Sequence, residues 1–147
     1  MTKNNEKLND FRNQLEKSNS EKKDLSNSEL SNLNLNEINL VNAKLNNSNL
    51  SRTSLQNASL YGADLSSSNL FKANFEGANL SNSNLTNCNL LGVNFTNTKL
   101  RNINWGKDFK VKNELDADQA MATGNYELAI KKYKESEEIY RTLKISM

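Results

Sequence analysis

Large apolar residues recur at every fifth position through the middle of the chain. The series begins at Leu30 and continues through Leu35 and Leu40, with Leu or Phe at every step until Trp105. Two residues before each of them lies a second column of mostly small, uncharged residues, and Asn, Ser, Lys and Glu fill most of the other places. A disordered Asn/Ser-rich tract is the alternative interpretation, but the unbroken register disfavours it.

A period of five matches neither the 3.6-residue period of an α-helix nor the two-residue period of a β-strand. Two inward positions separated by one outward residue fit a short strand-like step, and the remaining two residues can turn a corner. A corner after every five residues makes a coil with four sides that closes after twenty. The pattern therefore predicts a solenoid in which positions i and i+20 lie directly above one another.

This pattern closely resembles the pentapeptide-repeat family, whose motif is written A(D/N)LXX. The resemblance covers about residues 26–107, and its clearest matches are Ala63-Asp64-Leu65, Ala73-Asn74-Phe75 and Ala78-Asn79-Leu80. It implies a right-handed quadrilateral β-helix in which the central Leu or Phe and the preceding small residue point inward. We therefore predict an all-β solenoid of about four coils with helical ends, namely an N-terminal helix and a C-terminal helical hairpin.

The expected core follows from this stacking. Its predicted members occupy the centres of the pentapeptides: Leu65, Leu70, Phe75, Leu80, Leu85, Phe95 and Trp105. Phe75 is expected beneath Phe95, and Trp105 at the end of a leucine column, where it could close the core. Asn69 and Asn89 share one vertical row, in which stacked side-chain amides can hydrogen-bond. Cys88 falls in the small inward column and is predicted to be a buried structural thiol.

Both ends of the chain are predicted to be helical. Leu8, Phe11 and Leu15 form an apolar stripe within residues 5–18, which favours a short amphipathic helix that caps the first coil; a polar connector follows at 19–27. The predicted domains are 1–25, an N-terminal helix with its connector; 26–107, the pentapeptide-repeat β-helix; and 108–147, an α-helical hairpin.

The C-terminal hairpin is expected to consist of helices at 113–122 and 125–145, joined at Gly124. Its turn and second helix partly resemble a tetratricopeptide repeat, through Gly124, Tyr126, Ala129, Ile130 and Tyr133. The first helix departs from that motif, with Asn113 and Asp116 where Trp and Leu would stand. A single hairpin lacks the neighbours that a peptide-binding groove needs. Capping of the last coil is favoured over contact with a second copy, and a ligand groove is the weakest alternative.

A few outward positions are apolar, and these are the candidate interaction surface. Phe71 and Leu91 are twenty residues apart and should stack on one face, while Tyr61 and Val41 should stack on the opposite one. Exposed apolar pairs on a polar rod are candidates for contact with a protein partner or a second copy. The alternative is that a helix of the same chain covers them.

Composition excludes several classes of function. Of the 147 residues, 35% are hydrophobic, so only a thin, repetitive core can form. There is no histidine and one cysteine, which removes the commonest general base, the commonest metal ligand and any intramolecular disulfide. We predict neither an enzyme nor a metal or cofactor site. No apolar leader or membrane-length apolar run is apparent. This favours a cytoplasmic protein without a membrane partner, and the Asn/Lys-rich composition suggests a bacterial source.

Charge bears on the activity best described in the pentapeptide-repeat family, which is DNA mimicry by acidic rods that occupy the DNA site of gyrase. Duplex DNA carries one charge per ~1.7 Å, so a rod of ~19 Å should display about eleven negative charges. Residues 25–105 carry four acidic and five basic side chains. A gyrase inhibitor or protector is therefore the disfavoured alternative, and the scattered basic residues argue against nucleic-acid binding as well. The favoured function is a non-catalytic structural or protein–protein interaction module whose partner is unknown.

Overall fold

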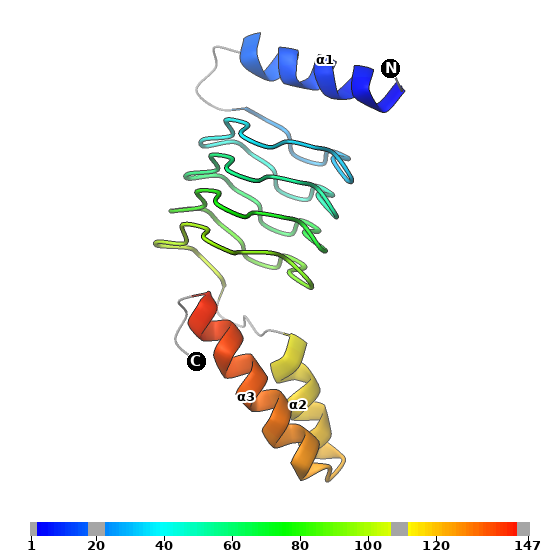
Figure 1. Ribbon diagram of the computed structural model, residues 1–147, viewed down its shortest axis with the longest axis vertical. Helices are drawn as coiled ribbons and strands as arrows, with labels where there is room; N and C mark the ends of the chain where they lie inside the picture. Colours follow the sequence, from blue (N-terminus) through cyan, green and yellow to red (C-terminus); the bar gives the residue numbers. More distant parts are fainter. Residues whose placement is uncertain (1–2, 18–22, 107–111, 144–147) are drawn as a thin grey trace. The chain divides into compact units, whose positions relative to one another are not determined.

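The computed structural model describes residues 3–17, 23–106 and 112–143. Its helices are α1 (Lys3–Lys17), α2 (Lys112–Ala122) and α3 (Tyr126–Thr142), and residues 23–106 consist of short steps and turns (Figure 1). The chain divides into two compact units, Met1–Gly106 and Lys107–Met147.

The repeat region of the first unit is a stack of parallel layers (Figure 1). Isolated parallel bridges join residues twenty positions apart, beginning with Asp24 and Lys44 and ending with Asn84 and Asn104. Each step bonds in both directions: the Asp64 N–H donates to the Ala43 carbonyl at 2.9 Å, and the Leu65 N–H donates to the Asn84 carbonyl at 2.9 Å. The predicted stacking of positions i and i+20 is thus confirmed.

The corners between steps are β-turns whose third residue has a left-handed backbone conformation. At one of them, the Ala63 N–H donates to the Leu60 carbonyl at 3.0 Å, and Gly62 has a φ of +68°. The equivalent residue has a positive φ at every corner from Asn27 to Asn102, and it is Asn or Gly at all but four. An L-residue in this conformation costs about 1–2 kcal/mol, and Asn and Gly adopt it most readily. The Asn and Gly at these places therefore follow from backbone sterics.

The acidic or amide residue of the motif stabilises the corner that follows it. Asp64 Oδ1 accepts a hydrogen bond from the Ser66 N–H at 3.0 Å, and Asn69 Oδ1 accepts one from the Phe71 N–H at 3.1 Å. This local bond satisfies a backbone donor that the turn would otherwise leave unpaired. The amides also bond between layers, since Asn89 Nδ2 donates to Asn69 Oδ1 at 3.2 Å, as the sequence predicted.

The core is a column of side chains inside the coils. Of the residues expected there, those with at most 1% of their surface exposed are Leu65, Leu70, Phe75, Leu80 and Leu85. Phe95 and Trp105 are half-buried. The rings of Phe75 and Phe95 stack with centroids 5.8 Å apart, and Trp105 meets Phe95 edge-on at 6.3 Å. Phe75, Phe95 and Trp105 therefore form one continuous aromatic group in the last layers.

Helix α1 lies in the same unit as the repeats. Leu15 is buried, and Leu8 and Phe11 are half-buried. Arg12 Nη2 donates to the carbonyl oxygens of Asn34 at 2.9 Å and Asn36 at 3.2 Å, which ties the helix to the first coil. The helix was predicted at 5–18; residue 18 and the first four residues of the connector predicted at 19–27 lie outside the described residues.

The second unit is a hairpin in which α2 and α3 pack side by side (Figure 1). Small residues lie at the contact: Ala117 and Ala129 are fully buried. The Tyr133 hydroxyl donates to Asp118 Oδ1 at 2.5 Å, and the Tyr140 hydroxyl donates to the Glu114 carboxylate.

The ends of the hairpin helices lie close to the predicted ones. Asn125 caps the start of α3, because its side chain accepts from the Leu128 N–H at 3.3 Å. The predicted end of this helix at residue 145 lies outside the described residues. Of the residues that carry the partial resemblance to a tetratricopeptide repeat, Ala129 is buried, whereas Tyr126 and Ile130 are exposed.

Candidate interaction surface

Phe71 and Leu91 lie at the same corner of neighbouring coils. The Lys72 N–H donates to the Leu91 carbonyl at 2.9 Å, and the Arg52 N–H donates to the Phe71 carbonyl at 2.7 Å. Leu91 exposes 47% of its surface and Phe71 is half-buried. We call Arg52, Phe71, Lys72 and Leu91 the Phe71 corner.

Two cations flank the aromatic ring of the Phe71 corner. The Arg52 guanidinium carbon lies 5.7 Å from the ring centroid and Lys72 Nζ lies 5.2 Å from it, both over the ring. Both distances are within the range of cation–π attraction. Sequence reasoning missed these cations, although a signal was present: Arg52 and Lys72 are themselves twenty residues apart, and Lys72 directly follows Phe71.

The second candidate pair, Val41 and Tyr61, is also brought together. The Asn42 N–H donates to the Tyr61 carbonyl at 2.8 Å, so the two residues occupy the same corner of adjacent coils. Tyr61 exposes 43% of its surface and Val41 is half-buried. Their turn partners are Asn42 and Gly62, so this corner carries no charge of its own in these two layers.

Cys88 has the surroundings of an inert thiol. It is half-buried, and its Sγ donates to the Leu65 carbonyl oxygen at 3.0 Å. Burial raises the pKa of this thiol to about 11, because the thiolate would lose its hydration. The group is thus protonated at neutral pH, and it is not a nucleophile there.

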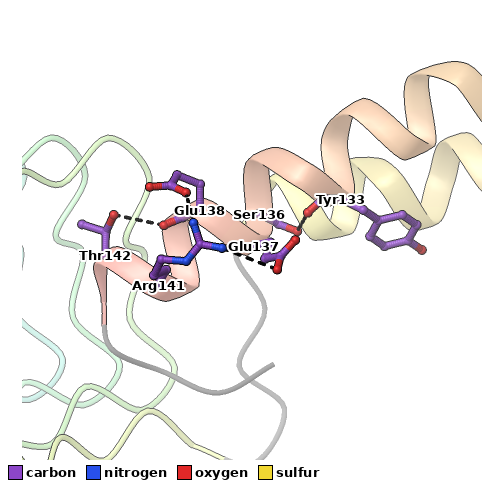
Figure 2. Close-up of polar contacts among 6 residues, drawn as sticks. All are labelled: Tyr133, Ser136, Glu137, Glu138, Arg141 and Thr142. Atoms are coloured by element: carbon purple, nitrogen blue, oxygen red, sulfur yellow. Dashed lines mark hydrogen bonds and ion pairs between the residues drawn. The ribbon is translucent and has the colours of Figure 1, made fainter.

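The described residues contain no group of three or more metal-ligating side chains. Charged groups on α3 pair along the helix instead of converging on a site (Figure 2). Arg141 contacts Glu138 at 2.5 Å and Glu137 at 3.6 Å, and the Ser136 hydroxyl donates to the Tyr133 carbonyl at 2.7 Å. In the described part of the chain, no helix has the length and apolar character to cross a bilayer.

A family model for pentapeptide repeats matches eight copies over residues 34–70 and 68–104. This match agrees with the five-residue period, with the bridges between residues twenty positions apart and with the buried leucine column. Residues 34–104 belong to the pentapeptide-repeat family. Pentapeptide-repeat proteins form right-handed quadrilateral β-helices and in general act as non-catalytic interaction modules. The comparison with curated protein sequences finds no match.

Solved structures similar to this chain are also pentapeptide-repeat proteins. One from Nostoc Pcc 7120 is 26% identical with a TM-score of 0.55, over 71% of this chain and 87% of the other. One from the cyanobacterium Cyanothece 51142 is 47% identical with a TM-score of 0.49, over 58% of this chain; the match spans only 61% of the cyanobacterial chain. A third, from the Arabidopsis thaliana thylakoid lumen, is 27% identical with a TM-score of 0.40, over 67% of this chain and 74% of the other.

Proposed function

We propose that this chain is a non-catalytic interaction module in which a rigid pentapeptide-repeat rod presents the Phe71 corner to a protein partner. Its proposed organisation is an N-terminal helix and connector at 1–25, a β-helix of about four coils at 26–107, and a helical hairpin at 108–147. One observation carries the proposal. The turn residues that stack at each corner of the coil are polar except in two vertical rows, and one of these rows holds Phe71 and Leu91.

The geometry of the repeat supports a role in binding. Backbone groups of neighbouring coils bond to one another, so recognition falls to side chains at the corners, which protrude from a backbone already held in place. A surface that is ordered before binding loses little conformational entropy when the complex forms. Exposed apolar side chains grouped in one place are typical of protein contacts.

The other parts of the chain have supporting roles in this proposal. The bonds from Arg12 to two carbonyl oxygens of the first coil support α1 as its cap. We assign the Val41–Tyr61 pair a secondary part, because no cation accompanies it in its two layers. The gyrase alternative has no comparable support, since the corner residues of the rod are mostly uncharged.

The test compares the wild-type chain with Phe71→Ser/Leu91→Ser. Light scattering over a range of concentrations reports self-association, and affinity capture from the native host reports other partners. We expect the double substitution to abolish the association that the wild type shows. Val41→Ser/Tyr61→Ser, which makes the same kind of change at the opposite corner, should retain it. A monodisperse wild-type monomer that captures the same proteins as the double variant would overturn the proposal.

A further inference from the structure

The Phe71 corner is cationic as well as apolar, and its cations stand in unfavourable backbone conformations. Arg52 and Lys72 have φ values of +57° and +55°, at corner positions that are Asn or Gly in most other layers. A long side chain in this conformation costs about 1–2 kcal/mol per residue. Two such residues, stacked at one corner, point to a role outside the folding of the rod.

The cations have no acidic partner in the part of the chain that the structure describes. Arg52 and Lys72 form no ion pair with any residue in the described ranges, although both are exposed. Below Lys72 lies Gly92, where a Cβ would stand 2.9 Å from Lys72 Cγ, so the stem of the lysine lies across the glycine beside Leu91. The corner therefore combines two unpaired positive charges with an aromatic ring and an exposed leucine.

We infer that the Phe71 corner binds an acidic peptide segment that also carries an apolar side chain. This inference rests on the proposed function and adds the chemistry of the partner. The apolar side chain contacts Leu91 and the edge of the Phe71 ring, while carboxylates pair with Arg52 and Lys72. Single-stranded nucleic acid fits less well, because its bases would stack on an aromatic face and the two cations already lie over this ring.

The experiment selects peptides from a random phage-displayed library on the full-length protein and measures the affinity of the enriched peptides by fluorescence anisotropy. Arg52→Asn/Lys72→Asn removes both cations and installs the residue found at most other corners, so this variant retains the fold. Lys99→Asn/Arg101→Asn removes the same charge elsewhere on the rod. A labelled oligothymidylate is measured in parallel.

We expect enriched peptides rich in Asp and Glu, which bind Arg52→Asn/Lys72→Asn about fivefold or more weakly, bind the control variant normally, and lose affinity as salt is raised. Equal affinity for both charge variants, or tighter binding of the oligothymidylate, overturns the inference. Peptides that depend on Phe71 and Leu91 but not on the cations overturn only this inference. Peptides that depend on neither, or no enrichment at all, overturn the proposed function as well.

Discussion

At the scale of single residues, the polar side chains of the inner column show how this core tolerates hydroxyl groups. The Ser68 hydroxyl donates to the Leu45 carbonyl at 2.6 Å, and the Thr53 hydroxyl donates to the Leu30 carbonyl at 2.7 Å. Both bonds reach back to the coil before. Ser83 is equally buried, but its hydroxyl has no partner among the described residues. A buried hydroxyl without a partner is destabilising, because it loses its bonds to water.

We predict opposite outcomes for two identical substitutions. Ser68→Ala should lower the free energy of unfolding by about 1 kcal/mol, since it removes the bond to Leu45 and the bond that Ser68 accepts from the Ser48 N–H. Ser83→Ala should leave the free energy of unfolding unchanged or raise it. Urea unfolding followed by Trp105 fluorescence measures both. Equal losses in the two variants would contradict the prediction.

The candidate site was only half predictable at this scale. The spacing of Phe71 and Leu91 placed them on one face, because i and i+20 stack. The approach of Arg52 and Lys72 to the ring was not foreseen, since side-chain direction at a corner depends on the left-handed backbone there. Periodicity locates a residue in the coil but does not determine where a long, flexible side chain ends.

At the scale of elements, the corner is the unit that the sequence specifies most strongly. The pentapeptide pattern predicted where the chain turns, and the Asx bond and the left-handed residue explain how it turns. Glu37, with a φ of +62°, is one of the corner residues that is neither Asn nor Gly. Asn47, two pentapeptides further along the chain, has nearly the same conformation at +57°.

We predict that Glu37→Asn raises the free energy of unfolding by up to about 1 kcal/mol, because Asn adopts the left-handed conformation at lower cost than Glu. The reverse change, Asn47→Glu, should lower it by a similar amount. Both side chains are exposed, so packing changes little. Thermal or urea unfolding of the two variants against the wild type provides the measurement. No difference between the two directions would argue against control of the corners by backbone sterics.

The positions of the helices in the chain were easier to predict than the exposure of their side chains. Gly124 and the cap residue Asn125 mark the turn between α2 and α3, and both are visible in the sequence. Tyr126 and Ile130 fall on the same broad face as the buried Ala129, yet they are exposed. A helical period defines an apolar face, but one partner helix covers only part of a broad face.

At the scale of the whole molecule, the repeat region behaves as a one-dimensional stack. Each coil contacts only the coils above and below it. The free energy of unfolding is therefore approximately the sum of the stabilities of single coils and of the interfaces between neighbours, so a substitution that destabilises one coil also destabilises the coils next to it. Leu65 is fully buried, whereas Leu91 exposes 47% of its surface. Substitutions of Leu65 and Leu91 therefore separate the contribution of the core to the free energy of unfolding from the contribution of the surface.

Leu65→Ala should lower the free energy of unfolding by about 2–5 kcal/mol through lost burial and a cavity. The unfolding transition should move even when it is read from Trp105, which lies forty positions further along the chain. Leu91→Ala, the same change at an exposed corner, should shift it by less than about 0.5 kcal/mol. A Trp105 signal that does not respond to Leu65→Ala would contradict the coupling between layers.

The sequence by itself determined the period, the inward leucine column, the stacking of positions twenty apart and membership of the pentapeptide-repeat family. It could do so because every pentapeptide has the same arrangement of inward, outward and turn positions, and that arrangement depends on residues adjacent in the sequence. Only the tertiary structure decided the partners of side chains: the cations over Phe71, the hydroxyl bonds of Ser68 and Thr53, and the carbonyls bound by Arg12. Those contacts join residues of different layers, and their geometry depends on the closed coil and not on any one segment.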